Sequence, residues 1–381
     1  FAVHRSGAAN NNIYVGVFCI GAYWLATLIA LRGNTLLAKV TKYGFLAGTV
    51  LPGIGLLVLF AYWAISGHPI GWTQTHDLAV SSVVNGHASP RWFPNIAGLG
   101  TLSFLAAILL LFAGVEVQAV HAADMKDARR GFPKAIFLAA GLCFAVFTLG
   151  SLAVAGILPY QDITLQSGVF DAFALPLTAL GVRWLGPIIA ALVCYGALGG
   201  ALAWIGGPSR ALLAPAEDGA LPPFLQHTNP KGVQRNILLV QGVIVTAISA
   251  VYLVMKDVSS AFFLISALVV GLYIIMYMLM FAAAIRLRYT RPDLPRHFRI
   301  PGGIVGMWAI AGIGFLAVSF ALVLVFVPPS QLPIGNPGSY ITLVAGGTII
   351  FTGLPLLIYR LRQPGWKNSA PAVDAPLKVA P

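Results

Sequence analysis

The stretch IAGLGTLSFLAAILLLFAGVEVQAVHAADM, residues 96–125, decides the fold because a long apolar run ends there in a glutamate. As one continuous helix, residues 98–123 would measure about 39 Å, whereas the hydrocarbon core of a bilayer is about 30 Å thick. Phe112, Ala113 and Gly114 stand just before Glu116. The stretch therefore predicts a membrane span that is broken beside a carboxylate.

The composition of the whole chain is typical of an integral membrane protein. Of its 381 residues, 58% are hydrophobic and 9% are charged, and the mean hydropathy is +0.86. A water-soluble domain carries about 25% charged residues. We therefore expect an all-α polytopic membrane protein. Its apolar runs predict nine spans, at residues 13–31, 44–66, 98–123, 135–158, 185–207, 236–255, 261–285, 304–327 and 340–359.

The 23 Lys and Arg residues orient the protein rather than indicate nucleic acid, although the net charge is +12. Nineteen of them follow the first, third, fifth, seventh and ninth spans, and Arg5, Arg91, Arg183 and Lys256 fall on the opposite side. Basic residues concentrate on the cytoplasmic side of membrane proteins. The pattern predicts an external N-terminus and a cytoplasmic C-terminus.

The sequence predicts one transmembrane domain, residues 1–360, and a disordered Pro- and Ala-rich cytoplasmic tail, residues 361–381. The longest external connection is residues 67–94. Residues 161–181 are too short and broken to span, and we expect them along the outer surface. Glycines four residues apart predict close helix packing, in the pairs Gly44 and Gly48, Gly196 and Gly200, and Gly302 and Gly306.

Several other functions are disfavoured by motifs that the sequence lacks. It contains no phosphate-binding loop, HExxH or GxSxG, so we expect neither an enzyme nor an ATP-driven pump, and no cofactor or metal. The cysteines, Cys19, Cys143 and Cys194, lie in separate spans and are interpreted as core residues. Phe1 follows no signal-peptide pattern and is interpreted as an artificial start.

Glu116 is the only one of the 11 acidic residues that lies inside a predicted span. A charge near mid-bilayer costs about 2.5–3.5 kcal/mol, so such residues usually face a cavity and have a function. Three interpretations stay open: a hydrogen-bonded staple of the helix break, direct proton coupling or substrate contact, and an accidental polar residue at a span end. His121 could titrate near neutrality, or it is an ordinary residue at a helix end.

Four stretches resemble the amino acid-polyamine-organocation superfamily of permeases and, within it, are most similar to the bacterial glutamate/γ-aminobutyrate antiporter group. Together they run from about residue 32 to 303. They are FAGVEVQAVHAADMKDARRGFPKAI (112–136), AWIGGPSRALLAPAEDGALPPFLQHTNPKGVQRN (203–236), ALVVGLYIIMYMLMF with RPDLPRHFRIPGG (267–281 and 291–303), and AKVTKYGFLAGTVLP (38–52).

The resemblance implies a five-plus-five inverted repeat followed by two helices, with the substrate held between broken spans one and six. The nine spans would then be family spans four to twelve, in an N-terminally truncated chain that lacks the substrate-carboxylate half of the site. The tail is shorter than the cytoplasmic plug of the antiporter group.

The resemblance also implies which residues form the site. Phe112, Ala113, Gly114 and Val115 would supply the break of span six, and Glu116 the coupling or structural carboxylate. Trp204 would be a wall between site and exit path, and Tyr273 with Tyr277 would line that path. The chain departs from the family in two ways: Leu110 and Leu111 stand where an aromatic gate is expected, and Gly200 stands where the antiporter group has a glutamate.

The function expected is secondary active transport of amino acids or related amines across the bacterial inner membrane, as an antiporter or a proton-coupled symporter, with glutamate/γ-aminobutyrate exchange as one possibility. The expected partners are the small-molecule substrate, the lipid bilayer and protons, and no nucleic acid. A membrane channel is the first alternative, although the chain has no ring of like charges or carbonyl-filter motif. A non-transporting amino-acid sensor or subunit is the second.

The charge pattern makes a prediction about orientation. Cysteines introduced at Asn85 and at Thr228 should react with a membrane-impermeant thiol reagent from outside and from inside respectively, because the two residues lie in loops of opposite charge bias. Labelling in intact cells and in inverted vesicles measures this. Reaction of both cysteines from one face would refute the nine-span count.

Overall fold

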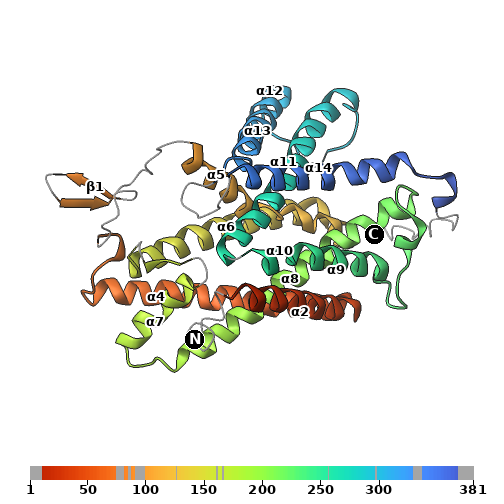
Figure 1. Ribbon diagram of the computed structural model, residues 1–381. Helices are drawn as coiled ribbons and strands as arrows, with labels where there is room; N and C mark the ends of the chain where they lie inside the picture. Colours follow the sequence, from red (N-terminus) through yellow and green to blue (C-terminus); the bar gives the residue numbers. More distant parts are fainter. Residues whose placement is uncertain are drawn as a thin grey trace.

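The computed structural model describes residues 11–73, 81–84, 87–90, 99–125, 127–159, 162–164, 167–255, 257–296, 298–328 and 337–367. Most of these residues are helical (Figure 1). The exception is an antiparallel hairpin of β1 (Ser81–Val84) and β2 (His87–Pro90), in which Ser81 pairs with Pro90. The predicted external connection, residues 67–94, contains this hairpin.

The helices that cross the fold follow the predicted apolar runs. The first half of the chain contains α2 (Asn12–Leu31), α3 (Asn34–Phe45), a π-helical turn (Leu46–Val50), α4 (Leu51–Ile65), α5 (Leu99–Phe112), the 3-10 helix η4 (Glu116–Asp124), α6 (Ala128–Ile157), α7 (Gly168–Ala179) and α8 (Leu185–Glu217). The second half contains α9 (Arg235–Ser249), α10 (Val251–Val254), α11 (Val258–Thr290), α12 (Gly303–Met307), a π-helical turn (Trp308–Gly312), α13 (Ile313–Val325) and α14 (Pro337–Arg360).

Polar caps define where several of these helices begin. The Asn11 side chain accepts a hydrogen bond from the Tyr14 amide, and the Asp257 side chain accepts one from the Ser260 amide. Such caps satisfy backbone N–H groups that have no partner in the first turn. The apolar runs therefore begin as helices at residues that the sequence marks.

Eight of the nine predicted spans are helices, or helices with a π-helical turn, that are long and apolar enough to cross a membrane. The remaining predicted span, residues 98–123, is divided between α5 and η4, which confirms the predicted break. Two helices end well after their predicted bounds: α8 continues to Glu217 and α11 to Thr290. These extensions carry Arg210, Arg286 and Arg288, so they continue the helices to the level of the lipid headgroups or beyond it.

Large apolar side chains cover the outside of the helices, as expected of a protein surrounded by lipid. Ile65 is 86% exposed and Ile349 is 71% exposed. No more than 28% of the apolar window of any of the eight spans is buried within the protein. Such surfaces would aggregate in water, so the fold requires the bilayer as its solvent.

Buried side chains gather in separate clusters that join the helices into groups. One cluster joins α5, α11, α13 and α14, a second joins α4, α6 and α7, and a third joins α2, α8 and α9. Figure 1 shows α11, α13 and α14 on one side of the molecule and α2, α4 and α8 on the other. The break follows α5, which belongs to the first cluster. Beyond the break, η4 contacts α6 of the second cluster and α8 of the third.

A close backbone contact joins the π-helical turn Leu46–Val50 to α8. A Cβ atom added at Gly48 would overlap the backbone of Gly196 and of Leu192, and one added at Gly44 would lie 3.1 Å from the Cα of Gly199. The prediction of close packing at Gly44, Gly48 and Gly196 is therefore confirmed.

The other glycines of the predicted pairs do not join helices. An added Cβ at Gly200 would meet nothing within 4 Å, and it is Gly199 that contacts Gly44. The pair Gly302 and Gly306 forms the start of α12, where Gly302 has a φ of 80° and its carbonyl accepts from the Gly306 amide. Residues four apart also form the first hydrogen bond of a helix, so this spacing did not indicate a contact between helices, and the prediction for Gly302 and Gly306 was wrong.

The start of the predicted disordered tail is ordered. Residues 364–366 form a short 3-10 helix, and the Gln226 side chain donates a 2.7 Å hydrogen bond to the Trp366 carbonyl. An added Cβ at Gly219 would lie 2.8 Å from the Lys367 nitrogen, so the loop after α8 contacts this segment directly. Residues 368–381 lie outside the described residues.

The glycine contact predicts different effects of two alanine substitutions in this region. Gly48→Ala should lower the melting temperature of the purified protein, because overpacking costs about 1–3 kcal/mol. Gly200→Ala, on α8 with open space at the Cβ position, is the control and should be neutral or slightly stabilising. Thermal unfolding in one detergent measures both, and equal melting temperatures would contradict the close backbone contact.

Candidate functional site

The candidate site is centred on the break between α5 and η4. Helix α5 ends at Phe112, residues 113–115 form a turn, and η4 begins at Glu116. Gly114 has a φ of 96°, in the region that side chains with a Cβ rarely adopt. A glycine at this position therefore allows the chain to leave one helix and enter the next within three residues.

The Glu116 carboxylate is hydrogen-bonded to the break that precedes it. Its Oε2 atom accepts from the Gly114 amide at 3.2 Å and from the Tyr277 hydroxyl at 3.0 Å. The Gly114 amide also points at the Tyr277 oxygen, 3.4 Å away. Hydrogen bonds to a charged group contribute about 1.5–3 kcal/mol. Glu116 therefore fixes the break and connects it to α11.

The second carboxylate oxygen of Glu116 is in a different situation. Oε1 is buried and has no hydrogen-bond partner among the described residues. A buried polar atom without a partner costs about 1–3 kcal/mol, and more if it is charged. Such an atom calls for an explanation, such as an ordered water, a bound ion or a functional role. Oε2 thus holds the backbone of the break, whereas Oε1 has no partner among the described residues.

Three aromatic side chains surround the break. The Trp204 ring, from α8, lies against Gly114: a Cβ added there would be 2.5 Å from Cζ2 and 2.7 Å from Cη2. Trp204 and Tyr273 meet edge to face with centroids 5.6 Å apart, and Tyr273 meets Tyr277 in the same way at 5.7 Å. The aromatic residues form a continuous row from α8 to α11 beside the carboxylate.

The structure brings together five of the residues predicted from the sequence: Gly114, Glu116, Trp204, Tyr273 and Tyr277. Ala113 and Val115 form the turn with Gly114, and both are half-buried. Phe112 is the last residue of α5, and its side chain is 39% exposed. The side chains of Leu110 and His121 lie outside the described residues.

Two features of the site were missed by sequence reasoning. The contact of Trp204 with Gly114 joins residues far apart in the chain, and no local pattern marks it. The second is the difference between the two Glu116 oxygens, of which only Oε2 has hydrogen-bond partners. This difference depends on the position of Tyr277, which was predicted only as a path-lining residue. The positive φ of Gly114 was foreseeable, since glycine at a helix break is the usual signal.

Comparison with known proteins supplies the identity of the fold. Residues 1–351 match the family described as amino acid permease. The chain is 36% identical to an uncharacterized transporter of Legionella pneumophila, with 91% of this chain and 72% of that protein covered. It is 32% identical to a glutamate/gamma-aminobutyrate antiporter of Lactococcus lactis (92% and 67% covered) and 23% identical to a probable agmatine/putrescine antiporter of the same species (91% and 79% covered).

The match over nearly the whole chain agrees with the architecture. Eight apolar helices and one broken span make a multi-pass membrane protein, and the relatives named above are transporters rather than enzymes. No group of three or more His, Cys, Asp or Glu that could hold a metal ion occurs in the described part of the chain. From its sequence match and its helical fold, the chain belongs to the amino acid permease family.

Proposed function

We propose that this protein is a secondary active transporter that exchanges amino acids or related amines, or carries them with protons, by alternating access. The observation that supports this best is the buried, unpartnered Oε1 atom of Glu116 at a helix break. Broken spans are the usual place of substrate and ion sites in transporters, because backbone without helical partners is tolerated in a membrane only beside a cavity or other protein.

The chemistry of the break favours a ligand with a positive group. Oε1 can accept a hydrogen bond from an ammonium group or can take up a proton, and both would remove the cost of an unpartnered buried carboxylate oxygen. Trp204, Tyr273 and Tyr277 lie beside it in one aromatic row, and aromatic faces attract cations at about 0.5–2 kcal/mol. An amine-bearing substrate would satisfy both features.

The relatives narrow the choice of substrates to assay. Two of them are named for glutamate and gamma-aminobutyrate and for agmatine and putrescine. Every one of these molecules carries an amine or guanidine. We infer that this chain also handles such a molecule, and glutamate with γ-aminobutyrate is the first pair to test because that relative has the higher identity.

Transport assays in proteoliposomes test the proposal in the full-length protein. A carrier should show saturable uptake of labelled glutamate or γ-aminobutyrate that increases when unlabelled substrate is inside the vesicles. Unsaturable flux that follows the membrane potential would indicate a channel instead. Binding of a substrate without any movement would indicate a sensor or subunit.

A substitution at Glu116 distinguishes a role in proton coupling from a purely structural role at the helix break. Glu116→Gln preserves the shape of the side chain and an oxygen that can accept from Gly114 and Tyr277, but it removes the exchangeable proton and the charge. We expect the variant to insert and fold, to bind substrate within about tenfold of the wild type, which is about 1.4 kcal/mol, and to lose the pH dependence of transport. Uptake measured from about pH 5 to about pH 8 provides the comparison.

Tyr277→Phe is the matched control because it removes the hydrogen bond to Oε2 and keeps the carboxylate. We expect it to retain pH-dependent transport at a reduced rate. If Glu116→Gln kept the wild-type pH profile, or failed to insert, the carboxylate would be a structural staple only. Loss of pH dependence in Tyr277→Phe as well would assign the effect to the geometry of the break.

A further inference from the structure

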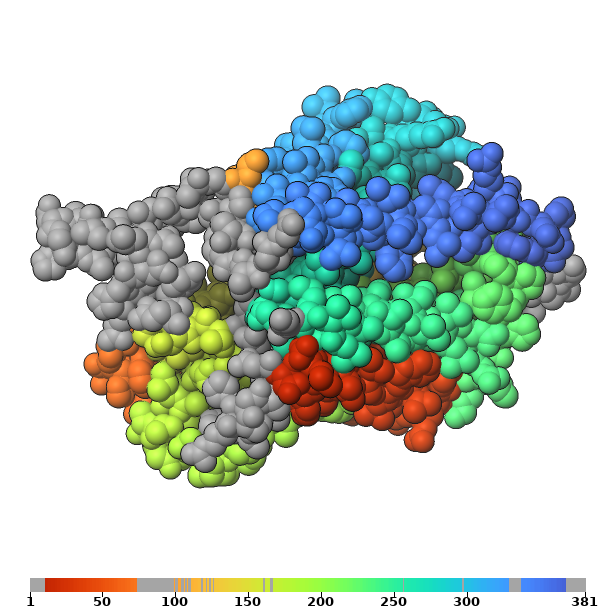
Figure 2. All heavy atoms as spheres, viewed as in Figure 1, coloured from red at the N-terminus to blue at the C-terminus, as the bar shows by residue number. Residues whose placement is uncertain are grey.

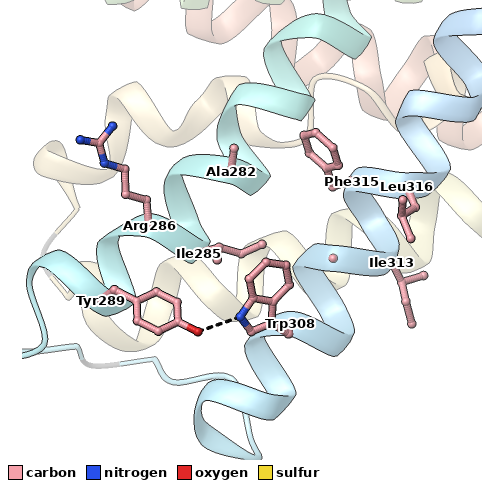
Figure 3. Close-up of a pocket in the computed structure, with 9 residues that line it drawn as sticks. Ala282, Ile285, Arg286, Tyr289, Trp308, Ile313, Phe315 and Leu316 are labelled. Carbon is pink, nitrogen blue, oxygen red and sulfur yellow. Dashed lines mark hydrogen bonds between the residues drawn. The ribbon is translucent and has the colours of Figure 1, made fainter.

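A cavity lies away from the helix break, at the outer edge of the molecule. It is a groove of about 640 Å³ between the last turns of α11 and the start of the α12–α13 helix (Figure 3). Tyr277, which contacts Glu116, lies nine residues before Arg286, so the groove is about 14 Å further along α11. The groove is lined by Ala282, Ile285, Arg286, Tyr289, Trp308, Gly312, Ile313, Phe315 and Leu316.

Small residues and a local change of helix type account for the groove. Ala282 on α11 and Gly312 in the facing segment both line the groove, and neither carries a side chain large enough to fill it. Residues 308–312 form a π-helical turn, and a single π-helical turn inside an α-helix is often found at a functional site. The lining of the groove beyond this turn is aliphatic and aromatic, which suits a hydrocarbon chain.

One end of the groove is amphipathic. The Trp308 indole Nε1 donates a 2.9 Å hydrogen bond to the Tyr289 hydroxyl oxygen, which leaves the hydroxyl proton for a further partner. Trp and Tyr favour the level of the lipid headgroups. Figure 3 shows Tyr289 and Ile285 directed toward Trp308, whereas the Arg286 guanidinium extends away from the apolar lining. This end of the groove has the polarity of a membrane interface.

The charge at this end is positive. Arg286 is the first of five arginines in the last turn of α11 and the loop after it, residues 286–299, and no carboxylate lines the groove among the described residues. Basic pockets between membrane helices at the cytoplasmic surface bind anionic lipid headgroups. The charge distribution of the sequence assigns this arginine-rich loop to the cytoplasmic side.

The groove opens toward the surroundings of the protein rather than toward its interior. Ile313 and Leu316, on its outer wall, are 68% and 69% exposed. In Figure 2 the corresponding helices form the upper edge of the molecule, at the periphery of the bundle. A molecule could therefore enter sideways from the bilayer without any opening of the helix break.

We propose that this groove binds one anionic glycerophospholipid, with an acyl chain along Ala282, Gly312 and Phe315, with a phosphate or ester oxygen at the Tyr289 hydroxyl, and with Arg286 supplying positive charge at the rim of the groove. The apolar lining matches the acyl chain, the arginine matches the phosphate charge, and the free hydroxyl proton of Tyr289 matches a phosphate or ester oxygen. An amino acid or amine does not fit, since the groove has no carboxylate for an ammonium group.

Native mass spectrometry of the purified full-length protein tests the proposal. The protein is mixed with equal amounts of phosphatidylglycerol and phosphatidylcholine, and the retained lipid is counted. We expect one preferred phosphatidylglycerol, and a loss of that preference by about fivefold in Arg286→Gln, which corresponds to about 1 kcal/mol for one basic residue near an anionic surface. Ala282→Phe should fill the groove and abolish retention of either lipid.

Matched controls lie on the same helix. Arg288→Gln removes a charge two residues away, and Ala283→Phe adds the same bulk at a neighbouring exposed position, and neither residue lines the groove. Both controls should retain phosphatidylglycerol as the wild type does. Arg286 is exposed, so its variant is expected to fold, and gel filtration verifies this for all four variants.

Three results would overturn the proposal. The first is equal retention of the two lipids by the wild type. The second is equal loss in Arg286→Gln and Arg288→Gln. The third is a disulfide-linked dimer through Ile313→Cys, in a chain whose native cysteines are replaced, that forms equally with and without phosphatidylglycerol. That outcome would make the groove an interface between two copies of the chain.

Discussion

The constraint on which this structure depends is that a backbone inside a membrane must find its hydrogen bonds within the protein. The break after Phe112 frees amide and carbonyl groups, and the Gly114 amide recovers a partner in Glu116 Oε2, with Tyr277 of α11 completing the arrangement. A charged residue that would be unfavourable in an unbroken span is thus required by the break. The second oxygen of the same residue, Oε1, is buried and has no partner among the described residues.

Around the break, two kinds of contact set the positions of the helices. Backbones touch directly where Gly44 and Gly48 meet α8, and large aromatic side chains fill the space where Trp204 meets Gly114 and Tyr273. The first kind allows little adjustment, because backbone atoms have no rotamers, whereas an aromatic row can change χ angles. The site is therefore bounded by one fixed contact and one adjustable contact, both of which involve α8.

Much of this could be read from the sequence, because a bilayer imposes simple rules. Apolar runs of about 20 residues predict spans, and nine runs correspond to eight unbroken helices and one broken one. A lone glutamate beside Gly114 predicted the break. The resemblance to amino-acid permeases, confirmed by the family match, selected Trp204, Tyr273 and Tyr277. The pairing of glycines was only partly right, since spacing along one helix does not specify which residue, Gly199 or Gly200, faces the partner.

The π-helical turn at Leu46–Val50 coincides with the glycine contact on α8, and this coincidence has a mechanical consequence. A π-helical turn replaces i→i−4 hydrogen bonds by i→i−5 bonds, so it is a natural place for a helix to bend. Here the bend is also the point where the chain is pressed against Gly196 without any intervening side chain. If α4 tilts relative to α8, the contact acts as a fulcrum: the ends of the two helices separate or approach while the atoms at the fulcrum stay in place and no side chain there has to repack.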